Sequence, residues 1–389
     1  MIEALYYAAA AVIALGGAVW AWLVRDMART SRHVPGLGDP VPAGASPRVS
    51  VIIPARNEEE HIGRCLESLA AQDYPDYEVM AVDDESTDGT GDIISRYARE
   101  HPRITHVRVG PKPPGWMGKC WACIEGYRRS DGGLLLFLDA DSDVSPGTIT
   151  GAVRQMGSGG TDVVTLIPSM RTPGFWLSIS IPVELCFMHG RSSPTNINDP
   201  EKSAANMVGA LYMMRRGTYE SVGTHEVVRG EAHEDIALAR ITKKAGYGIR
   251  VVRGMSHCRG IGCRGMSDMW DMARRARISS RPKHMIHVIR EVATFLLLLV
   301  APLPALAASI YLGGPGSWAL SAASGVSASL MFAAVAVKAR QGTTAGAWHA
   351  AFAPLGGMVL ILKTVASMTG STVEWRGRTY QIREDGGAG

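Results

Sequence analysis

Two hydrophobic patterns divide the chain. From residue 48 to residue 265, short β-branched runs alternate with segments whose apolar residues recur at helical spacing. Near both ends, the chain instead carries long apolar runs without charge. Strands that alternate with helices are typical of an α/β domain with a mainly parallel sheet. The pattern therefore predicts one α/β domain flanked by membrane-embedded segments.

Four strands are expected in the first half of the α/β domain. They read RVSVIIP, YEVMAVDD, RITHVRV and GLLLFLDAD, and they begin at residues 48, 77, 103 and 133. A helix is expected after the first strand, where Ile62, Cys65, Leu66 and Leu69 recur at helical spacing. Parallel sheets bind ligands at the carboxyl ends of their strands. Carboxylates that follow these strands are therefore the first candidates for chemistry.

The terminal apolar runs are long enough to cross a bilayer. Ala4–Val24, Val292–Leu312 and Ser317–Val337 each hold 21 residues. At ~1.5 Å per residue each would form about 31 Å of helix, which matches a hydrocarbon core of roughly 30 Å. A fourth run, Ala347–Leu362, is shorter and interrupted by proline and glycine. We expect two C-terminal spans and a third segment that is either spanning or re-entrant.

The first apolar run could be a signal peptide or an uncleaved anchor. Only Glu3 carries charge ahead of it, so the basic start of a signal peptide is missing, and we favour an anchor. Arg25, Arg29 and Arg32 follow this run, and an arginine cluster precedes the second. This bias predicts that residues 25–291 face the cytosol. The arginines of the tail fit the same charge bias only if the fourth run does not span the membrane.

The segment at residues 266–291 has two interpretations. It is rich in Met, Trp, Ile and Arg, so both an interfacial amphipathic helix and a core helix with a basic outer face fit the pattern. The adjoining membrane run favours the interface, where a lipid could reach the protein without leaving the bilayer. The expected organisation is an anchor at 1–24, a linker at 25–47, the α/β domain at 48–265, the interfacial segment at 266–291, membrane segments at 292–369 and a tail at 370–389.

Composition excludes some classes of protein. The 389 residues include 40 Lys and Arg and 36 Asp and Glu, a net charge of +4, which is too small for a general nucleic-acid binder. Six cysteines fit a reducing compartment. Cys120 and Cys123 form only half of a zinc spacing, so small buried thiols are the better interpretation.

Three acidic pairs are candidates for chemistry. Asp139 and Asp141 follow the fourth strand, where a hard divalent cation could take their oxygens, although such a pair also occurs in solvated turns. Asp83-Asp84 follows the second strand and could bind a nucleotide, whereas the adjacent Ser86, Thr87 and Asp88 suit helix capping. Glu234-Asp235 opens a helix and could serve as a base or only as a partner of the helix dipole.

The combination of motifs is more specific than any one of them. VSVIIPARNEEEHI, VDDESTDGT, FLDADSDV and HEDIALA, in this order and spacing, resemble family 2 of the glycosyltransferases. PPGWMGKCWA and the tail VEWRGRTY are similar to the membrane-bound subgroup that includes hopene-associated and carotenoid glycosyltransferases and, more distantly, ceramide glucosyltransferases. The resemblance is strong over residues 48–258 and loose elsewhere.

The resemblance implies a GT-A fold, which is Rossmann-like with a mainly parallel sheet. It implies an inverting, metal-dependent transfer from a nucleotide-diphosphate sugar to a lipid or isoprenoid-type acceptor at the cytosolic face of the cell membrane, with Mg²⁺ or Mn²⁺ as cofactor. The partners would be the sugar donor, the lipid acceptor and the bilayer, with no nucleic acid.

Site residues also follow from the resemblance. Asp235 matches the catalytic base and Glu234 its companion. The metal ligands would be Asp139 and Asp141, with Asp141 the more direct. The nucleotide-sugar contacts would be Pro54, Arg56, Glu58, Asp83, Asp84, Lys119 and Asp139.

One motif departs from the family pattern. Many relatives carry Q-x-x-R-W or R-x-x-R-W after the base. Here the nearest match has Arg274 and Arg277 but Ile278 in place of Trp, and Trp270 stands in another register. Acceptor or diphosphate contacts at Trp270, Arg274 and Arg277 are therefore the weakest part of the assignment.

Two other functions remain as alternatives. A processive polysaccharide synthase would need more membrane spans and a complete Q-x-x-R-W motif. A non-catalytic sugar-nucleotide-binding membrane protein would have no need of Asp139, Asp141 and Asp235. Transfer of sugar to a lipid is the function that the sequence favours.

Overall fold

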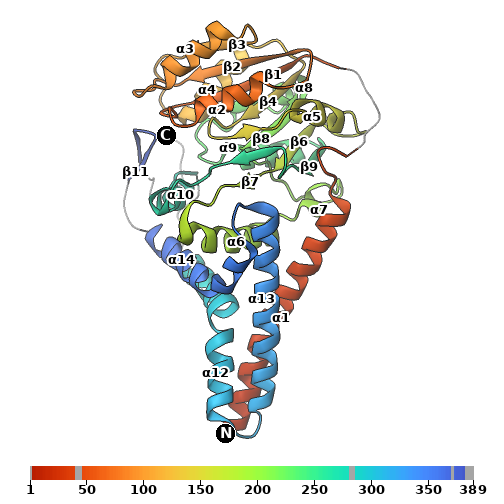
Figure 1. The fold of residues 1–389 in the computed structure, drawn as a ribbon, viewed down its shortest axis with the longest axis vertical. Coiled ribbons are helices and arrows are strands. Elements are labelled where there is room, and N and C mark those ends of the chain that lie inside the picture. The colour runs from red at the N-terminus through yellow and green to blue at the C-terminus, as the bar shows by residue number, and fades with distance from the viewer. Residues whose placement is uncertain (1, 40–45, 280–284, 369–371, 382–389) are drawn as a thin grey trace.

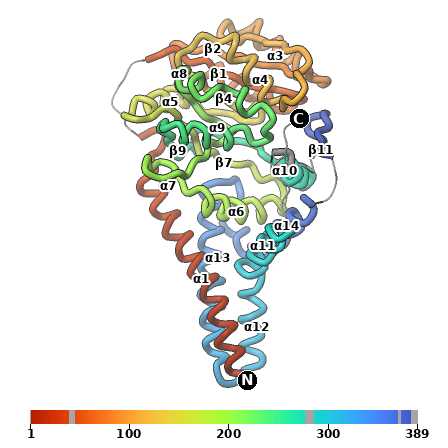
Figure 2. Tube along the Cα trace, turned by 180° about the vertical axis from the view of Figure 1, so that it is seen from behind, coloured from red at the N-terminus to blue at the C-terminus, as the bar shows by residue number. Residues whose placement is uncertain are grey.

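The computed structural model describes residues 2–39, 46–279, 285–368 and 372–381. An α/β domain sits on a tapering group of long helices (Figure 1), and the same arrangement is seen from behind in Figure 2. The N-terminus lies at the narrow end, far from the α/β domain. The expected α/β domain, with apolar helices at both ends of the chain, is confirmed.

A seven-stranded sheet forms the centre of the α/β domain. The strand order is β3-β2-β1-β4-β8-β6-β9, and only β8 runs antiparallel to its neighbours β4 and β6. The four strands expected from the sequence are present as the first four in chain order. The strands are β1 (Val49–Ala55), β2 (Tyr77–Asp83), β3 (Ile104–Arg108), β4 (Leu134–Leu138), β6 (Val163–Ile167), β8 (Leu211–Arg215) and β9 (Ile249–Arg253).

Helices cover both faces of the sheet. Alternate residues of a strand point to opposite faces, so Val51 and Ile53 pack on one side and Ile52 on the other. The first side is covered by α2 (Ile62–Ala70), α3 (Thr90–Glu100) and α5 (Thr148–Met156). The second side is covered by α4 (Gly118–Arg128), α8 (Arg216–Ser221) and α9 (Glu234–Lys244).

Short elements complete the polar part of the molecule. Three two- or three-residue strands form a small sheet, and a separate hairpin lies near the C-terminus. The small sheet contains β5 (Asp143–Val144), β10 (Cys258–Gly260) and β7 (Ser169–Met170), and the hairpin contains β11 (Thr372–Trp375) and β12 (Arg378–Gln381). The remaining short helices are α7 (Pro194–Ile197) and η1 (Thr224–Glu226).

The N-terminal helix is longer than the sequence pattern predicts. Helix α1 spans Ile2–His33, so residues 25–33, which we expected in the linker, continue the helix toward the α/β domain. It packs along α13 (Ser317–Gly342) (Figure 1). Both helices are long and apolar enough to cross a membrane. The hydrophobic pattern predicts that the span ends before the first arginine, but it gives no information on whether helix α1 continues beyond the span.

The second apolar run is bent. It is divided into α11 (Met285–Phe295), a π-helical turn at Leu296–Val300 and α12 (Pro302–Leu312), with 53° between the two halves. Pro302 has no N–H to offer the carbonyl of Leu298 four residues earlier, and the indole of Trp20 on α1 donates to that carbonyl at 3.0 Å. The bend therefore follows from the proline ring, and the carbonyl of Leu298 that it leaves free accepts a hydrogen bond from Trp20.

The last apolar segment begins and ends against the α/β domain. It contains η3 (Ala347–Phe352) and α14 (Ala353–Ala366), which together are also long and apolar enough to span. Just before it, the backbone N–H of Thr344 donates to the carbonyl of Met170 at 2.9 Å. After it, the β11–β12 hairpin contacts Asp84 at the end of β2. Both flanks of this segment thus contact the α/β domain, and whether the segment spans the membrane or is re-entrant stays a prediction.

Two helices lie between the domain and the long helices. Helix α6 (Gly174–Arg191) and helix α10 (Met266–Ser279) pack together with α14 (Figure 1). Met269 of α10 is buried against α6, and the hydroxyl of Ser180 donates to its sulfur at 3.7 Å. The segment expected at the interface therefore buries one face against other helices at the base of the domain.

Candidate active site

A cavity of about 560 Å³ opens at the carboxyl ends of β1, β2 and β4. Most of the acidic and nucleotide-binding residues expected from the sequence line it. These are Pro54, Arg56, Glu58, Asp84, Lys119, Asp139, Asp141, Glu234 and Asp235. Asp83, Trp270 and Arg274 are not among the lining residues, and the structure does not describe the side chain of Arg277.

The acidic loop after β4 separates its three carboxylates. Asp139 forms an ion pair with Lys119 at 2.7 Å. Asp143 turns to Arg171 at 2.9 Å and Arg64 at 3.3 Å, away from the cavity lining. Asp141 faces the cavity, and no hydrogen bond or ion pair joins its carboxylate to another described residue. Burial and the neighbouring Asp139 raise the pKa of Asp141 to about 6.

The donor atoms of Asp139 and Asp141 fit a divalent cation that shares its ligands with a substrate. Among the residues that the structure describes, no group of three or more His, Cys, Asp or Glu side chains is placed to hold a metal by itself. Mg²⁺ usually takes one or two protein carboxylates and completes its shell with water and substrate phosphates. The unpaired carboxylate of Asp141 is the side chain best suited to such a role.

Lys119 joins the acidic loop to the start of α9. It stands in the first turn of α4 and contacts Glu234 at 2.6 Å as well as Asp139. Burial alone would lower the pKa of Lys119, but the carboxylates around it outweigh burial and raise it well above its ordinary value. Lys119 is therefore a fixed positive charge between the expected metal ligand and the expected catalytic pair.

The carboxylate of Asp235 is held by backbone groups. Its Oδ2 accepts from the N–H of Gly209 at 2.7 Å and its Oδ1 from the N–H of Ile236 at 2.8 Å. Burial raises the pKa of Asp235 and raises that of Glu234 to about 6. This carboxylate is oriented at the cavity wall and, when ionised, can accept a proton there.

Two further residues at this wall were not predicted as site residues. A Cβ at Gly209 would lie 3.1 Å from both Asp235 Oδ2 and Lys119 Nζ, so a side chain there would crowd the catalytic groups. His233, at the N-cap of α9, lines the cavity, and burial lowers its pKa. The close approach at Gly209 depends on tertiary structure, so no local pattern could have identified it.

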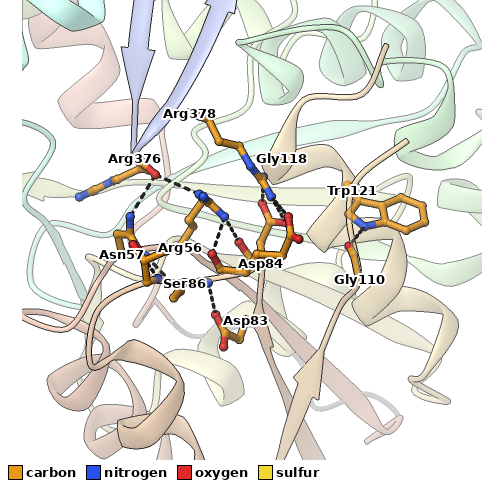
Figure 3. A network of polar contacts seen from close by, with 12 residues as sticks. Arg56, Asn57, Asp83, Asp84, Ser86, Gly110, Gly118, Trp121, Arg376 and Arg378 are labelled. Atoms are coloured by element: carbon orange, nitrogen blue, oxygen red, sulfur yellow. Dashed lines mark hydrogen bonds and ion pairs between the residues drawn. The ribbon is translucent and has the colours of Figure 1, made fainter. Parts of the chain in front are cut away.

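The two carboxylates after β2 have different surroundings (Figure 3). Asp83 accepts from the N–H of Ser86 at 3.0 Å and faces His106 at 3.8 Å, outside the cavity lining. Asp84 lines the cavity, and burial raises its pKa. The sequence left the choice between them open, and the geometry favours Asp84 for contact with a ligand.

Four cationic side chains at the cavity were not identified from the sequence. Arg264 lines the cavity and pairs with Glu58 at 3.1 Å. Arg275 of α10 lines the cavity, although the motif comparison indicated its neighbours Arg274 and Arg277. Arg376 and Arg378 come from the C-terminal hairpin and lie close to Asp84 and Arg56 (Figure 3). The tail sequence contributed to the family resemblance, but its contacts could not be read from it.

Helix α6 adds apolar side chains to the cavity. Ile181, Leu185 and Met188 of α6 line it, together with Met272 of α10. The Met188 side chain is 49% exposed. Within the same helix, Glu184 pairs with Lys363 of α14 at 2.5 Å. One cavity therefore joins a charged wall at the strand ends to an apolar wall beside the membrane-type helices.

Comparison with known proteins agrees with this fold. Residues 50–223 match the family described as glycosyl transferase family 2. The chain is 36% identical over 137 residues to a β-monoglucosyldiacylglycerol synthase of Synechocystis, a match that covers 34% of this chain and 28% of that protein. It is 25% identical over 209 residues to a 4,4'-diaponeurosporenoate glycosyltransferase of Staphylococcus aureus, covering 53% of this chain and 54% of that protein.

One solved structure has the same fold over most of its length. It is a mannosyltransferase from Pyrobaculum calidifontis in complex with GDP-Man and Mn²⁺, with a TM-score of 0.54 at 21% identity. The alignment covers 94% of this chain and 99% of that one. Matches to the two curated relatives, in contrast, extend over only about a quarter and about half of their lengths.

Proposed function

Because the chain carries a glycosyltransferase family 2 domain, we propose that it transfers a sugar from a nucleotide-diphosphate sugar to a lipid acceptor in the membrane, with inversion at the sugar carbon. One observation supports this proposal above the others. A single cavity joins a carboxylate- and arginine-lined wall to an apolar wall on α6, beside the helices that could cross a membrane. A polar donor and an apolar acceptor could therefore meet in it.

Asp235 is the proposed base. The acceptor hydroxyl attacks the anomeric carbon, its proton passes to Asp235 Oδ, and the bond to the diphosphate breaks with its electron pair remaining on the phosphate oxygen. The backbone N–H groups of Gly209 and Ile236 keep the carboxylate oriented for this transfer. A single displacement without an enzyme nucleophile inverts the configuration.

Asp139 and Asp141 would hold Mg²⁺ or Mn²⁺ together with the donor phosphates. When bound, the cation would neutralise negative charge that develops on the leaving diphosphate. Lys119 places a further positive charge next to Asp139 and Glu234. Pro54, Arg56, Glu58 and Asp84 line the same wall and are proposed to contact the nucleotide part of the donor.

The membrane placement is also part of the proposal. The arginines that follow the first apolar run and precede the second favour a cytosolic α/β domain. The hairpin after the last apolar segment lies on that domain, so the tail would share its compartment. An acceptor lipid would then approach from the cytosolic leaflet along α6.

The deciding experiment supplies both substrates. Purified protein in vesicles of host lipid extract is incubated with Mn²⁺ and a panel of radiolabelled UDP- and GDP-sugars. We expect label in the organic-extractable lipid fraction, and far less of it with Asp235→Asn. Label in an insoluble polymer would indicate a polysaccharide synthase. Donor binding without any transfer would indicate a non-catalytic binding protein.

A further inference from the structure

The C-terminal hairpin inserts its tip into the donor end of the cavity. Its two-residue loop, Arg376-Gly377, has φ values of 51° and 73°, the left-handed geometry of a tight hairpin turn. The carbonyl of Arg376 accepts from Arg56 Nε at 2.9 Å and from Asn57 Nδ2 at 3.2 Å. These contacts fix the loop against the segment that follows β1 (Figure 3).

Both arginines of the hairpin are paired with acidic residues of the donor wall. Arg378 binds both oxygens of Asp84, one of them at 3.0 Å, and also contacts Glu85 at 2.6 Å. Arg376 contacts Glu58 at 2.5 Å. Burial raises the pKa of Glu58 to about 8, against the opposing effect of Arg376. Asp84 and Glu58, two of the expected nucleotide contacts, are therefore occupied by the tail.

The charge of the cavity explains why such arginines are needed. Ten carboxylates and six lysine or arginine side chains line it, and two of the six are Arg376 and Arg378. A diphosphate is itself strongly negative, so an acidic cavity would repel it unless cations gather where the phosphates lie. The hairpin supplies one third of the cationic side chains of the wall.

Two neighbouring features are suited to an anion at this position. Arg275 lies 5.0 Å from the ring of Trp375, and its Nε is buried without a hydrogen-bond partner among the described residues. The N-terminus of α4 begins at Gly118, where a Cβ would come within 2.5 Å of Arg378. Backbone N–H groups at a helix N-terminus favour anions. Arg275 thus lies beside the hairpin with an unused donor, and at the start of α4 the N–H of Gly118 donates to the hydroxyl of Tyr380, also in the hairpin, at 3.4 Å.

We propose that the hairpin is a donor-binding lid whose Arg376 and Arg378 contact the diphosphate of the sugar nucleotide. Without donor, Glu58 and Asp84 hold the two guanidinium groups in place, and these acids become available to the nucleotide once the guanidinium groups turn away. When the donor binds, the planar guanidinium groups turn to the phosphates, which they can bind through two parallel hydrogen bonds. This inference rests on the proposed function and adds residues from the far end of the chain to its donor site.

The test compares nucleotides that differ by one phosphate. Affinities of the full-length protein for UDP, UMP, GDP and GMP are measured with Mn²⁺ by calorimetry, for wild type, Arg376→Ala and Arg378→Ala. We expect each alanine variant to weaken binding of the preferred diphosphate by roughly 10- to 100-fold, the size of a lost charge-assisted hydrogen bond, and to change monophosphate binding by less than about 3-fold. Arg378→Lys should recover part of the loss.

Arg240→Ala, at an exposed position on α9, is the matched control and should leave all four affinities unchanged. Unchanged diphosphate binding in both hairpin variants would overturn the inference while leaving the proposed function intact. Tighter binding would mean that the hairpin is an inhibitory plug, and it too would overturn the inference. A wild-type protein that binds neither diphosphate would reject the proposed function itself. A thermal melt identifies any variant that fails to fold, and Arg378→Lys then carries the test.

Discussion

The two walls of the cavity are built in opposite ways. The donor wall gathers charged side chains from distant parts of the chain: the segments after β1, β2 and β4, the start of α9 and the C-terminal hairpin. The acceptor wall is a single stretch of α6, supported by α10 and α14, and it is apolar apart from Glu184, which pairs with Lys363. Charge selects and orients a nucleotide, whereas an apolar wall accepts many lipids of similar shape. Asp235 lies in the same cavity as both walls.

This contrast predicts that substitutions in the donor wall impair use of the sugar nucleotide, whereas substitutions in the acceptor wall impair use of the lipid. The largest effect is expected for Asp141→Ala, which should abolish transfer because the best-placed metal ligand is lost. The protein should fold normally, since removing one carboxylate from a crowded group relieves repulsion. The measurement is transfer together with Mn²⁺-dependent donor affinity, and a thermal melt is the control. Normal turnover in this variant with metal chelated would reject a metal role for Asp141.

The next largest effect is expected at the junction of the walls. Asp235→Asn keeps the size of the side chain but cannot accept a proton, so single-turnover transfer should fall by roughly 10²–10⁴-fold. Donor affinity should change little. If Asp235 only stabilises the start of α9, the cost would be about 1 kcal/mol or less of stability, with transfer near normal. A joint loss of donor affinity would point instead to a structural role.

The acceptor wall should respond to a single charge. Met188→Asp places a carboxylate on the apolar surface of α6 at a half-exposed position, so we expect a roughly 10-fold higher KM for the lipid with donor affinity unchanged. Met188→Leu is the matched control and should behave like wild type. If the aspartate variant raised only the KM for the donor, α6 would not form the acceptor wall.

The smallest effect is a pH dependence shared by the catalytic pair. Burial raises the pKa of Asp235, and that of Glu234 to about 6. Transfer should therefore fall toward acid pH, because a protonated Asp235 cannot act as a base and because Glu234 beside it takes up a proton as the pH is lowered through about 6. Single-turnover rates between pH 5 and 8 at saturating donor test this. The residual rate of Asp235→Asn should lack this dependence, and an identical acidic limb in that variant would assign the titration elsewhere.

Local patterns predicted the centre of the domain well. The β-branched run of β1 and the apolar run of β4 reflect burial on both faces of a sheet, and carboxylates at strand ends are visible in the sequence itself. The contacts of the β11–β12 hairpin could not be predicted from the sequence, for a physical reason. Arg378 pairs with Asp84 across 294 positions of the chain, and no periodicity encodes such a contact.

The orientation of α10 also could not be read from the sequence. The family motif pointed to Arg274 and Arg277, whereas Arg275 lines the cavity and Arg274 pairs with Asp271 at 3.5 Å. Choosing among adjacent residues of a helix requires knowing its orientation against α6 and α14. The continuation of α1 past the first arginines was missed because a polar helix next to the domain has no hydrophobic signal.

The most direct test of the central claim is the anomeric configuration of the sugar on the product lipid, determined by NMR. The claim is that Asp235 alone activates an acceptor between the two walls, so the bond to the sugar is replaced once. The account predicts a configuration opposite to that in the donor. A retained configuration would require two successive displacements through an enzyme nucleophile, and it would contradict the assignment of Asp235 as the base.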